Sequence, residues 1–260
     1  MSSQNSAVKT ITVAAVLCVV CSIIVSTTVV ILKPMQIKNA EIDYKKNILM
    51  AAGLMEPGDD VEEVFKQIET VIVDLATGKI VDSSVVDPKS YDQAKASKGG
   101  EMAVSIPSDK DVAGLVTRAK YAKVFLTRND AGDINEVILY HRGKGLWSTM
   151  HGFIALAADT TTVKGFAYYS QGETPGLGGE VDNPAWKAQW VGKKIFGESG
   201  DVQFQLEKGT VDASSAVADY RVDGLSGATI TGNGVSSSIK YWFSSHGYGK
   251  FLENIRMGEI

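Results

Sequence analysis

A run of small residues near the end of the chain carries the clearest potential for chemistry: Asp-Gly-Leu-Ser-Gly-Ala-Thr-Ile-Thr over residues 223–231. Gly227 and Ala228 would let a large group come close to the backbone. A threonine hydroxyl in such a setting suits a phosphate, either bound there or esterified to the hydroxyl. The alternative is an ordinary glycine-containing loop that caps a helix.

The flanking residues indicate a turn from a strand into a helix. Val222 and Leu225 are typical of an arriving strand, and residues 235–243 have the pattern of a helix, with Thr231 or Asn233 as its N-cap. The first N–H groups of a helix have no partner within it, and the helix dipole favours negative charge there. A hydroxyl at this turn therefore lies where an anion is stabilised.

Two further stretches are candidates for a binding site. Residues 171–179, Gln-Gly-Glu-Thr-Pro-Gly-Leu-Gly-Gly, follow a predicted strand, and Pro175 and Gly176 fit the two central positions of a type II turn. Residues 143–148, Gly-Lys-Gly-Leu-Trp-Ser, also follow a strand. On their own, these stretches indicate no more than two turns.

Taken in order, the three stretches resemble the signatures of the FMN-binding domains of bacterial redox-driven ion pumps. The pattern Asp-x-x-Ser-Gly-Ala-Thr resembles the flavinylation motif of that family, in which a flavin transferase cuts FAD and esterifies the FMN phosphate onto the last threonine. By position, that residue is Thr229 and not Thr231. The resemblance implies that Asp223 and Ser226 serve recognition by the transferase or the geometry of the loop.

The string Glu-Thr-Pro-Gly-Leu-Gly is similar to the family's second signature, which lies against the isoalloxazine ring, where Leu177 could tune the flavin. Residues 143–148 resemble the family's Gly-x-Gly-x-Trp turn, so Trp147 either stacks near the ring or belongs to the core. No catalytic and no metal-binding residue is implied. The implied cofactor-binding residues besides Thr229 are Asp223, Ser226, Gly227, Ala228, Glu173, Thr174, Gly176, Leu177, Gly178 and Trp147.

Within this family the resemblance is strongest to the C subunits of Na⁺-translocating NADH:quinone oxidoreductases. The G subunits of ferredoxin:NAD⁺ oxidoreductase complexes are the alternative. The resemblance implies an electron carrier with covalent FMN, in a membrane complex that oxidises NADH, reduces ubiquinone and pumps Na⁺. Its expected partners are the other subunits, including a second FMN-carrying subunit, and the transferase during maturation. Two other possibilities stay open: a membrane-tethered assembly module without redox function, and a stand-alone extracytoplasmic flavoprotein reductase.

The N-terminal segment, residues 1–33, predicts a membrane anchor. No charged residue occurs from Thr10 to Leu32, and 17 of the 22 residues over 11–32 are apolar. As a helix these 22 residues reach ~33 Å, enough for a hydrocarbon core of ~30 Å. A signal peptide would have a shorter apolar core and a small-residue cleavage site. The apolar run ends in Ile-Leu-Lys-Pro, which is a poor cleavage site. The sequence therefore favours an uncleaved single-pass anchor.

Two arguments place the domain after the span on opposite sides of the membrane. Lys9 precedes the span, whereas Lys33, Lys38, Lys45 and Lys46 follow it, and this count places the C-terminal side in the cytoplasm. The family resemblance implies an inner-membrane protein whose flavin domain faces the periplasm. Long domains translocate largely regardless of charge, so we expect the periplasmic arrangement.

Composition and charge exclude several classes. The net charge of −4 argues against a nucleic-acid surface, and the three histidines lack the spacing of a zinc site. Cys18 and Cys21 lie one helical turn apart within the span. They face lipid or a partner helix, or they contribute to a metal or cluster shared with another subunit.

The rest of the chain predicts an α+β fold with a mostly antiparallel sheet. We expect a membrane-proximal part over 34–121 and the FMN-binding domain over 122–260. The expected elements are a stalk after the anchor, a helix capped by Asp59 or Asp60 and ending at Gln67, hairpins over 70–81 and 122–140, a long loop over 89–107, a strand pair over 153–169, a helix over 184–195 and a strand over 202–206.

Overall fold

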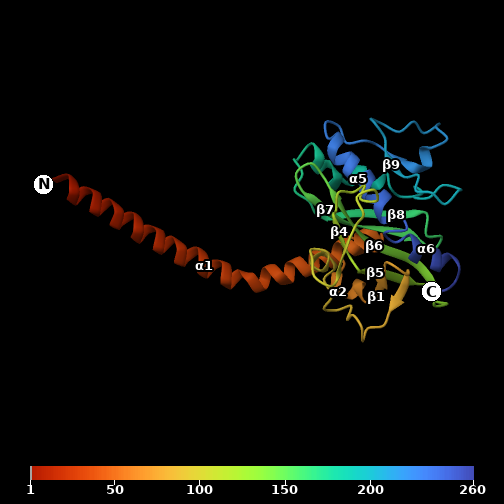
Figure 1. The fold of residues 1–260 in the computed structure, drawn as a ribbon, viewed down its shortest axis with the longest axis horizontal. Helices are drawn as coiled ribbons and strands as arrows, with labels where there is room; N and C mark the ends of the chain where they lie inside the picture. The colour runs from red at the N-terminus through yellow and green to blue at the C-terminus, as the bar shows by residue number, and fades with distance from the viewer. Residues whose placement is uncertain (1) are drawn as a thin grey trace. The chain divides into compact units, whose positions relative to one another are not determined.

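The computed structural model describes residues 2–260, with side chains from Ser6 onward, and forms two compact units, one up to Tyr44 and one over residues 45–260. One long helix, α1 (Ser2–Ala51), makes up the first unit and ends within the second (Figure 1). The helix continues through Pro34, so the predicted stalk is a direct extension of the anchor.

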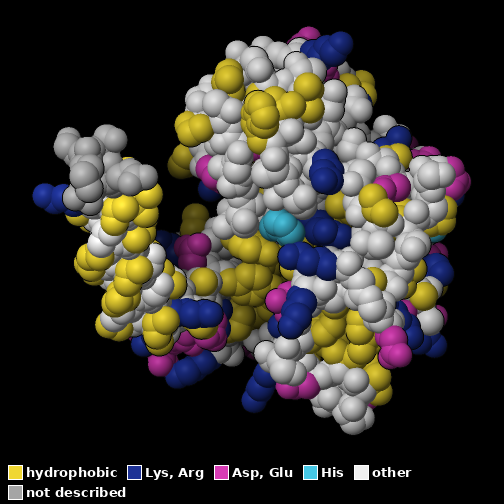
Figure 2. Space-filling model, turned by 60° about the vertical axis from the view of Figure 1, so that its left-hand side comes forward, with side chains coloured by type: hydrophobic (Ala, Val, Ile, Leu, Met, Phe, Trp, Pro, Cys, Tyr) yellow, Lys and Arg dark blue, Asp and Glu magenta, His cyan; other side chains and the backbone are white. Residues whose placement is uncertain are grey.

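The first unit has the properties of a membrane span. Residues 6–51 include a window of mean hydropathy 2.8 that is long and apolar enough to cross a membrane. The hydroxyls of Thr10, Thr12 and Thr28 donate to carbonyls four residues earlier, which satisfies them without water. Figure 2 shows this part of α1 as a column of mainly apolar side chains. Cys18 and Cys21 are exposed on it as free thiols.

The second unit is built on a six-stranded sheet whose strands pair antiparallel throughout, in the order β2-β1-β5-β6-β7-β8. The predicted α+β class and the three predicted strand pairs are confirmed. The strands are β1 (Glu69–Asp74), β2 (Lys79–Val81), β5 (Tyr121–Arg128), β6 (Ile134–Lys144), β7 (Thr149–Ala157) and β8 (Val163–Ser170).

Successive side chains along each strand point to opposite faces of the sheet. Helices pack on both faces. Leu139 and Ile154 face the two C-terminal helices, α5 (Thr229–Trp242) and α6 (Gly249–Arg256), in the main core. On the opposite face Phe125 packs edge-on against Phe65 of α2 (Val61–Phe65), with ring centroids 6.3 Å apart. Asp60 caps α2, as predicted.

The last turns of α1 belong to the second unit. Ile48, Leu49 and Ala51 are fully buried, and the helix ends with Leu54 N–H donating to the Leu49 carbonyl. The second unit therefore includes the end of the helix that contains the apolar span.

Three sequence predictions were wrong in extent. The expected loop over 89–107 contains α3 (Gln93–Ala96) and β3 (Ala103–Ser105), which pairs with β4 (Thr117–Ala119). The expected helix over 184–195 ends after α4 (Pro184–Ala188), because the chain turns so that Trp190 stacks on Phe166 of β8, with centroids 3.8 Å apart. Of the strand over 202–206, only β9 (Gln205–Leu206) forms, paired with β10 (Arg221–Val222).

Candidate functional site

Thr229 is the first residue of α5, and its side chain is exposed. The prediction that this helix starts near Val235 with Thr231 or Asn233 as N-cap was wrong. The N-cap position is Ala228, which makes no side-chain capping bond. The hydroxyl of Thr229 therefore lies at the first turn, where N–H groups lack helical partners and the dipole favours a phosphate.

Helix α5 is fixed against the carboxyl end of β6. His141 Nδ1 lies 3.2 Å from the Ser238 hydroxyl, and the Trp242 indole donates to the Arg142 carbonyl at 2.8 Å. Because β6 ends at Lys144, this packing brings the helix that carries Thr229 next to the turn that joins β6 to β7 (Figure 1).

The β6–β7 turn presents Trp147 to solvent. The turn closes with the Gly145 N–H donating to the Ser148 carbonyl at 2.8 Å. Trp147 is 71% exposed and Leu146 is 49% exposed. Of the two predicted roles for Trp147, membership of the core is wrong, and its indole face is free to contact a flat ring.

The second stretch, after β8, forms the predicted type II turn. Leu177 N–H donates to the Thr174 carbonyl at 3.1 Å, and Gly176 has a φ of 76°, which this turn requires at its third residue. Thr174 and Leu177 are exposed. A Cβ on Gly227 would lie 2.9 Å from Leu177 Cδ2, so this apolar side chain lies directly on the loop that precedes Thr229.

Glu173 is buried and its carboxylate is fully engaged by the protein. It accepts hydrogen bonds from the N–H groups of Leu146, Trp147 and Ser148, each at 3.0 Å, and from the hydroxyls of Ser148 at 3.0 Å and Thr231 at 2.6 Å. Burial raises the pKa of this carboxyl, but the hydrogen bonds from Thr231 and the turn outweigh it, so its pKa is below the usual value.

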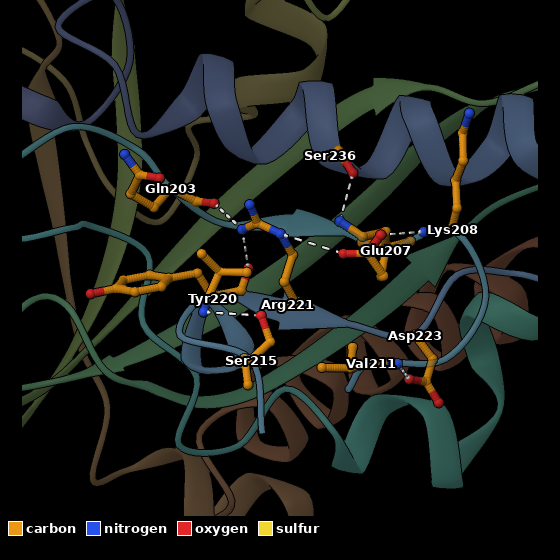
Figure 3. Close-up of polar contacts among 12 residues, drawn as sticks. Gln203, Glu207, Lys208, Val211, Ser215, Tyr220, Arg221, Asp223 and Ser236 are labelled. Carbon is orange, nitrogen blue, oxygen red and sulfur yellow. Dashed lines mark hydrogen bonds and ion pairs between the residues drawn. The ribbon is translucent and has the colours of Figure 1, made fainter. Parts of the chain in front are cut away.

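Asp223 holds the approach to the loop that precedes Thr229. Its carboxylate accepts from Val211 N–H at 2.7 Å and from the Gln189 amide at 3.0 Å, and its carbonyl accepts from the Trp186 indole. Figure 3 shows Asp223 beside Val211. In the same view the Arg221 side chain donates to the Gln203 carbonyl. These contacts favour the loop-geometry role for Asp223. Ser226, in contrast, is exposed and open to a partner.

The exposed groups around Thr229 fit a flavin phosphate and ring. The hydroxyl and the helix start suit the phosphate, and the exposed apolar surface of Trp147 and Leu177 suits a planar ring. Ala228 and Gly178 are buried. In the described residues, no three His, Cys, Asp or Glu side chains are grouped to hold a metal.

Sequence reasoning missed three contributors: the N–H groups of residues 146–148, the Gln189 side chain and the Thr231 hydroxyl as a donor to Glu173. Thr231 and Glu173 are 58 positions apart. In the sequence, each of the two stretches carries a polar residue among small ones. This pattern does not reveal that Glu173 and Thr231 form a hydrogen bond.

Comparison with known proteins identifies the class and then the family. Residues 145–244, which include the Trp147 turn and both other motifs, match the FMN-binding domain family. Over the whole length of both chains, the protein is 44% identical to the C subunit of the Na⁺-translocating NADH-quinone reductase of Pseudomonas aeruginosa and 43% identical to that of Vibrio parahaemolyticus. The chain belongs to this C-subunit family.

Solved structures agree with this assignment. The crystal structure of NqrC from Shewanella oneidensis matches with a TM-score of 0.75 and 33% identity, over 82% of this chain and 96% of that one. The C subunit of the Na⁺-translocating NADH-quinone reductase from Parabacteroides distasonis matches with a TM-score of 0.64 and 28% identity, over 85% and 96% of the two chains. The predicted preference for the C-subunit family over the G-subunit family is confirmed.

Proposed function

We propose that Thr229 carries FMN through a phosphoester and that the chain acts as an electron-carrier subunit of a Na⁺-translocating NADH:quinone reductase. The observation that carries the proposal is the position of Thr229: an exposed hydroxyl at the first residue of α5, preceded by the small residues Gly227 and Ala228. Thr231, the other threonine of the motif, is 1% exposed and already donates to Glu173.

The attachment reaction is a phosphoryl-group transfer from FAD. The Thr229 Oγ1–phosphorus bond forms, the bond from that phosphorus to the bridging oxygen of the pyrophosphate breaks, AMP leaves and the hydroxyl proton is released. A flavin transferase supplies the catalysis. The start of α5 stabilises the phosphate charge on the product, and the exposed Ser226 offers the transferase a polar contact.

When bound, FMN supplies the electron-transfer chemistry, and the protein supplies position and environment. Trp147 and Leu177 offer apolar surface to the ring, and the type II turn at Pro175 and Gly176 fixes Leu177 there. Asp223 anchors the loop through Gln189 and Val211. The exposure of Thr174, Leu177 and Trp147 leaves one side of the site open, which suits electron exchange with another subunit.

The partners follow from the family's complex. Electrons from NADH reach this subunit through other subunits and continue to a second FMN-carrying subunit and ubiquinone. The span contains no carboxylate, so Na⁺ crosses elsewhere in the complex. We assign FMN binding to residues 122–260, where all three motifs lie, and the membrane-proximal role to residues 34–121.

The flavin domain is proposed to face the periplasm, with α1 as a single-pass anchor in the inner membrane. A long folded domain can follow its anchor across when few charges precede the span. Alkaline phosphatase fused at Ile260 is expected to be active, and a fluorescent protein at the same position dark. The reverse pair of results would place the domain in the cytoplasm, as the lysine count predicts.

Flavin fluorescence on a denaturing gel tests the attachment residue. Wild-type protein produced with the flavin transferase is expected to fluoresce after denaturation, and Thr229→Ala to be dark. Thr231→Ala keeps the attachment residue and is expected to become fluorescent after long incubation. A fluorescent Thr229→Ala band would refute the assignment, and a dark wild-type band would favour an assembly module without redox function.

A further inference from the structure

We infer that Glu173 is a positioning residue that locks the turn carrying Trp147 to the first turn of α5, so that the attachment hydroxyl and the ring-contacting side chain keep a fixed register. The inference rests on the proposed attachment of FMN to Thr229. It assigns Glu173 to the protein framework and not to direct contact with the cofactor.

Each oxygen of Glu173 joins different parts of the site. Oε1 accepts from the N–H groups of Trp147 and Ser148 and from the Ser148 hydroxyl, all at 3.0 Å. Oε2 accepts from Leu146 N–H at 3.0 Å and from the Thr231 hydroxyl at 2.6 Å. One carboxylate thus connects the β6–β7 turn, its own segment after β8 and the start of α5.

The hydrogen-bond donors around Glu173 require its carboxylate to be ionised. Three consecutive backbone N–H groups point at one carboxylate, an arrangement that stabilises negative charge without a cation. Hydrogen bonds to an ionised acceptor are shorter and stronger than neutral ones, and the 2.6 Å bond from Thr231 agrees with this. Within the described residues, no ion pair involves Glu173. A neutral amide in its place would oppose an N–H group to one of these donors.

Two glycines leave room for this arrangement and for nothing larger. A Cβ on Gly145 would lie 2.5 Å from Glu173 Oε1. A Cβ on Gly178 would lie 2.6 Å from the Thr231 hydroxyl oxygen and 3.0 Å from Glu173 Oε2. Gly178, which the family resemblance placed among the cofactor-binding residues, therefore has a specific role here: it allows Thr231 and Glu173 to meet.

The bond to Thr231 determines how α5 presents Thr229. The two threonines are two positions apart on the first turn, and Thr231 points inward while Thr229 is exposed. Fixing the inward hydroxyl fixes the rotation of this turn, whose N-cap residue makes no side-chain bond of its own. Without the bond to Glu173, the first turn would lose its polar anchor and the Thr229 hydroxyl would lose its fixed direction.

The test measures the initial rate at which limiting flavin transferase labels full-length protein with FAD, followed by in-gel fluorescence. Glu173→Gln and Thr231→Val are expected to be labelled at least tenfold more slowly than wild type, with melting temperatures measured in parallel. Thr231→Ser keeps the hydroxyl and is expected to retain the wild-type rate, which a merely structural role for the threonine methyl group would not predict. Glu198→Gln, at an exposed residue outside the site, is the matched control.

Combining Glu173→Gln with Thr231→Val is expected to slow labelling by less than the product of the two single effects, since both changes weaken the bond between Glu173 and Thr231. Wild-type rates for both single variants would overturn the inference. Thr229→Ala separates the two proposals: if it is still labelled, the attachment site is wrong, whatever the rates of the other variants.

Hydrogen exchange supplies a readout that needs no flavin. In Glu173→Ala the amides of residues 146–148 are expected to lose protection, while the amides of β6 and β7 keep theirs. Unchanged protection at 146–148 would equally overturn the inference. Should Glu173→Ala not fold, Gly178→Ala, which forces Thr231 and Glu173 apart, is expected to slow labelling as Thr231→Val does, and a wild-type rate for it would count against the lock.

Discussion

Asp223 and Gln189 form a reciprocal pair: the Asp223 N–H donates to Gln189 Oε1 and the Gln189 amide donates to Asp223 Oδ2, both at 3.0 Å. The pair ties the segment after α4 to the start of the loop that precedes Thr229. Because a third bond from Val211 N–H also ends on Asp223, the residue is shared between two backbone segments that lie far apart in sequence.

Replacing Asp223 by Ala is expected to destabilise the domain by ~1–3 kcal/mol, since donors of Gln189 and Val211 lose their acceptor. The modified fraction is expected to fall with it. Gln189→Ala breaks the same pair without touching the motif, and chemical denaturation together with gel fluorescence compares the two. If Asp223→Ala alone reduced labelling, recognition by the transferase would be its main role; if it were fully labelled, the residue would be only structural.

Replacement of Trp147 by Ala should alter the flavin spectrum with little loss of stability, whereas replacement of Trp190 by Ala should mainly lower stability. Trp147 is 71% exposed, so its loss should change stability by no more than ~0.5 kcal/mol. Trp190 is fully buried and stacked on Phe166, so its loss should cost ~3–5 kcal/mol. Visible absorption and circular dichroism of the bound flavin should change only for Trp147→Ala in protein that remains folded. An unchanged flavin spectrum in that variant would place the ring away from Trp147.

Removing the anchor should leave a domain of full stability only if the end of α1 is kept. A chain that starts at residue 34 retains Ile48 and Leu49, which are fully buried, and is expected to give a sharp thermal transition. A chain that starts at residue 53 loses both, at ~1.5–3 kcal/mol for each side chain, and should melt at a lower temperature. Equal melting temperatures would show that the end of α1 does not support the sheet, and aggregation of the longer chain would show that the domain depends on its anchor.

Acid should destabilise the domain through the buried His141 and the half-buried His151. Burial, with a smaller effect of His151, lowers the pKa of His141 to about 3, and burial with nearby Arg142 and Lys98 lowers that of His151 to about 4. Between these values and the ordinary pKa of ~6.5 the unfolded chain binds more protons than the folded one. Stability should therefore fall as pH falls from about 6.5, by up to ~1.4 kcal/mol per pH unit for each histidine. Denaturation of His141→Gln should show a shallower slope between pH 6 and pH 4.5, and an unchanged slope would contradict the buried neutral state.

Alternating patterns predicted the sheet well, because each strand buries one or both faces and the turns carry Gly, Asn or Asp. The start of α5 was missed for a physical reason. Gly232 and Gly234 lie in its first two turns, each costing ~1 kcal/mol relative to Ala in a helix. Packing of Ser238 and Trp242 on β6 compensates, and no local pattern reveals that packing.

The site was predicted at the level of motifs and not of contacts. Thr229 and Leu177 could be singled out because each stretch resembles a family signature. Glu173 accepts five hydrogen bonds, and Thr231 points inward to it. Both features arise because two turns and the start of helix α5 meet in space. Such a meeting follows from the order of β6, β7 and β8 in the sheet and has no signal within any one segment.

The most direct test of the central claim is tandem mass spectrometry of the tryptic peptide over residues 222–240, taken from protein purified from its native membrane. This peptide contains both Thr229 and Thr231, so its fragments distinguish them. The proposed function predicts a peptide carrying FMN less one water, with the added mass on Thr229. An unmodified peptide, or added mass on Thr231 or Ser226, would contradict it.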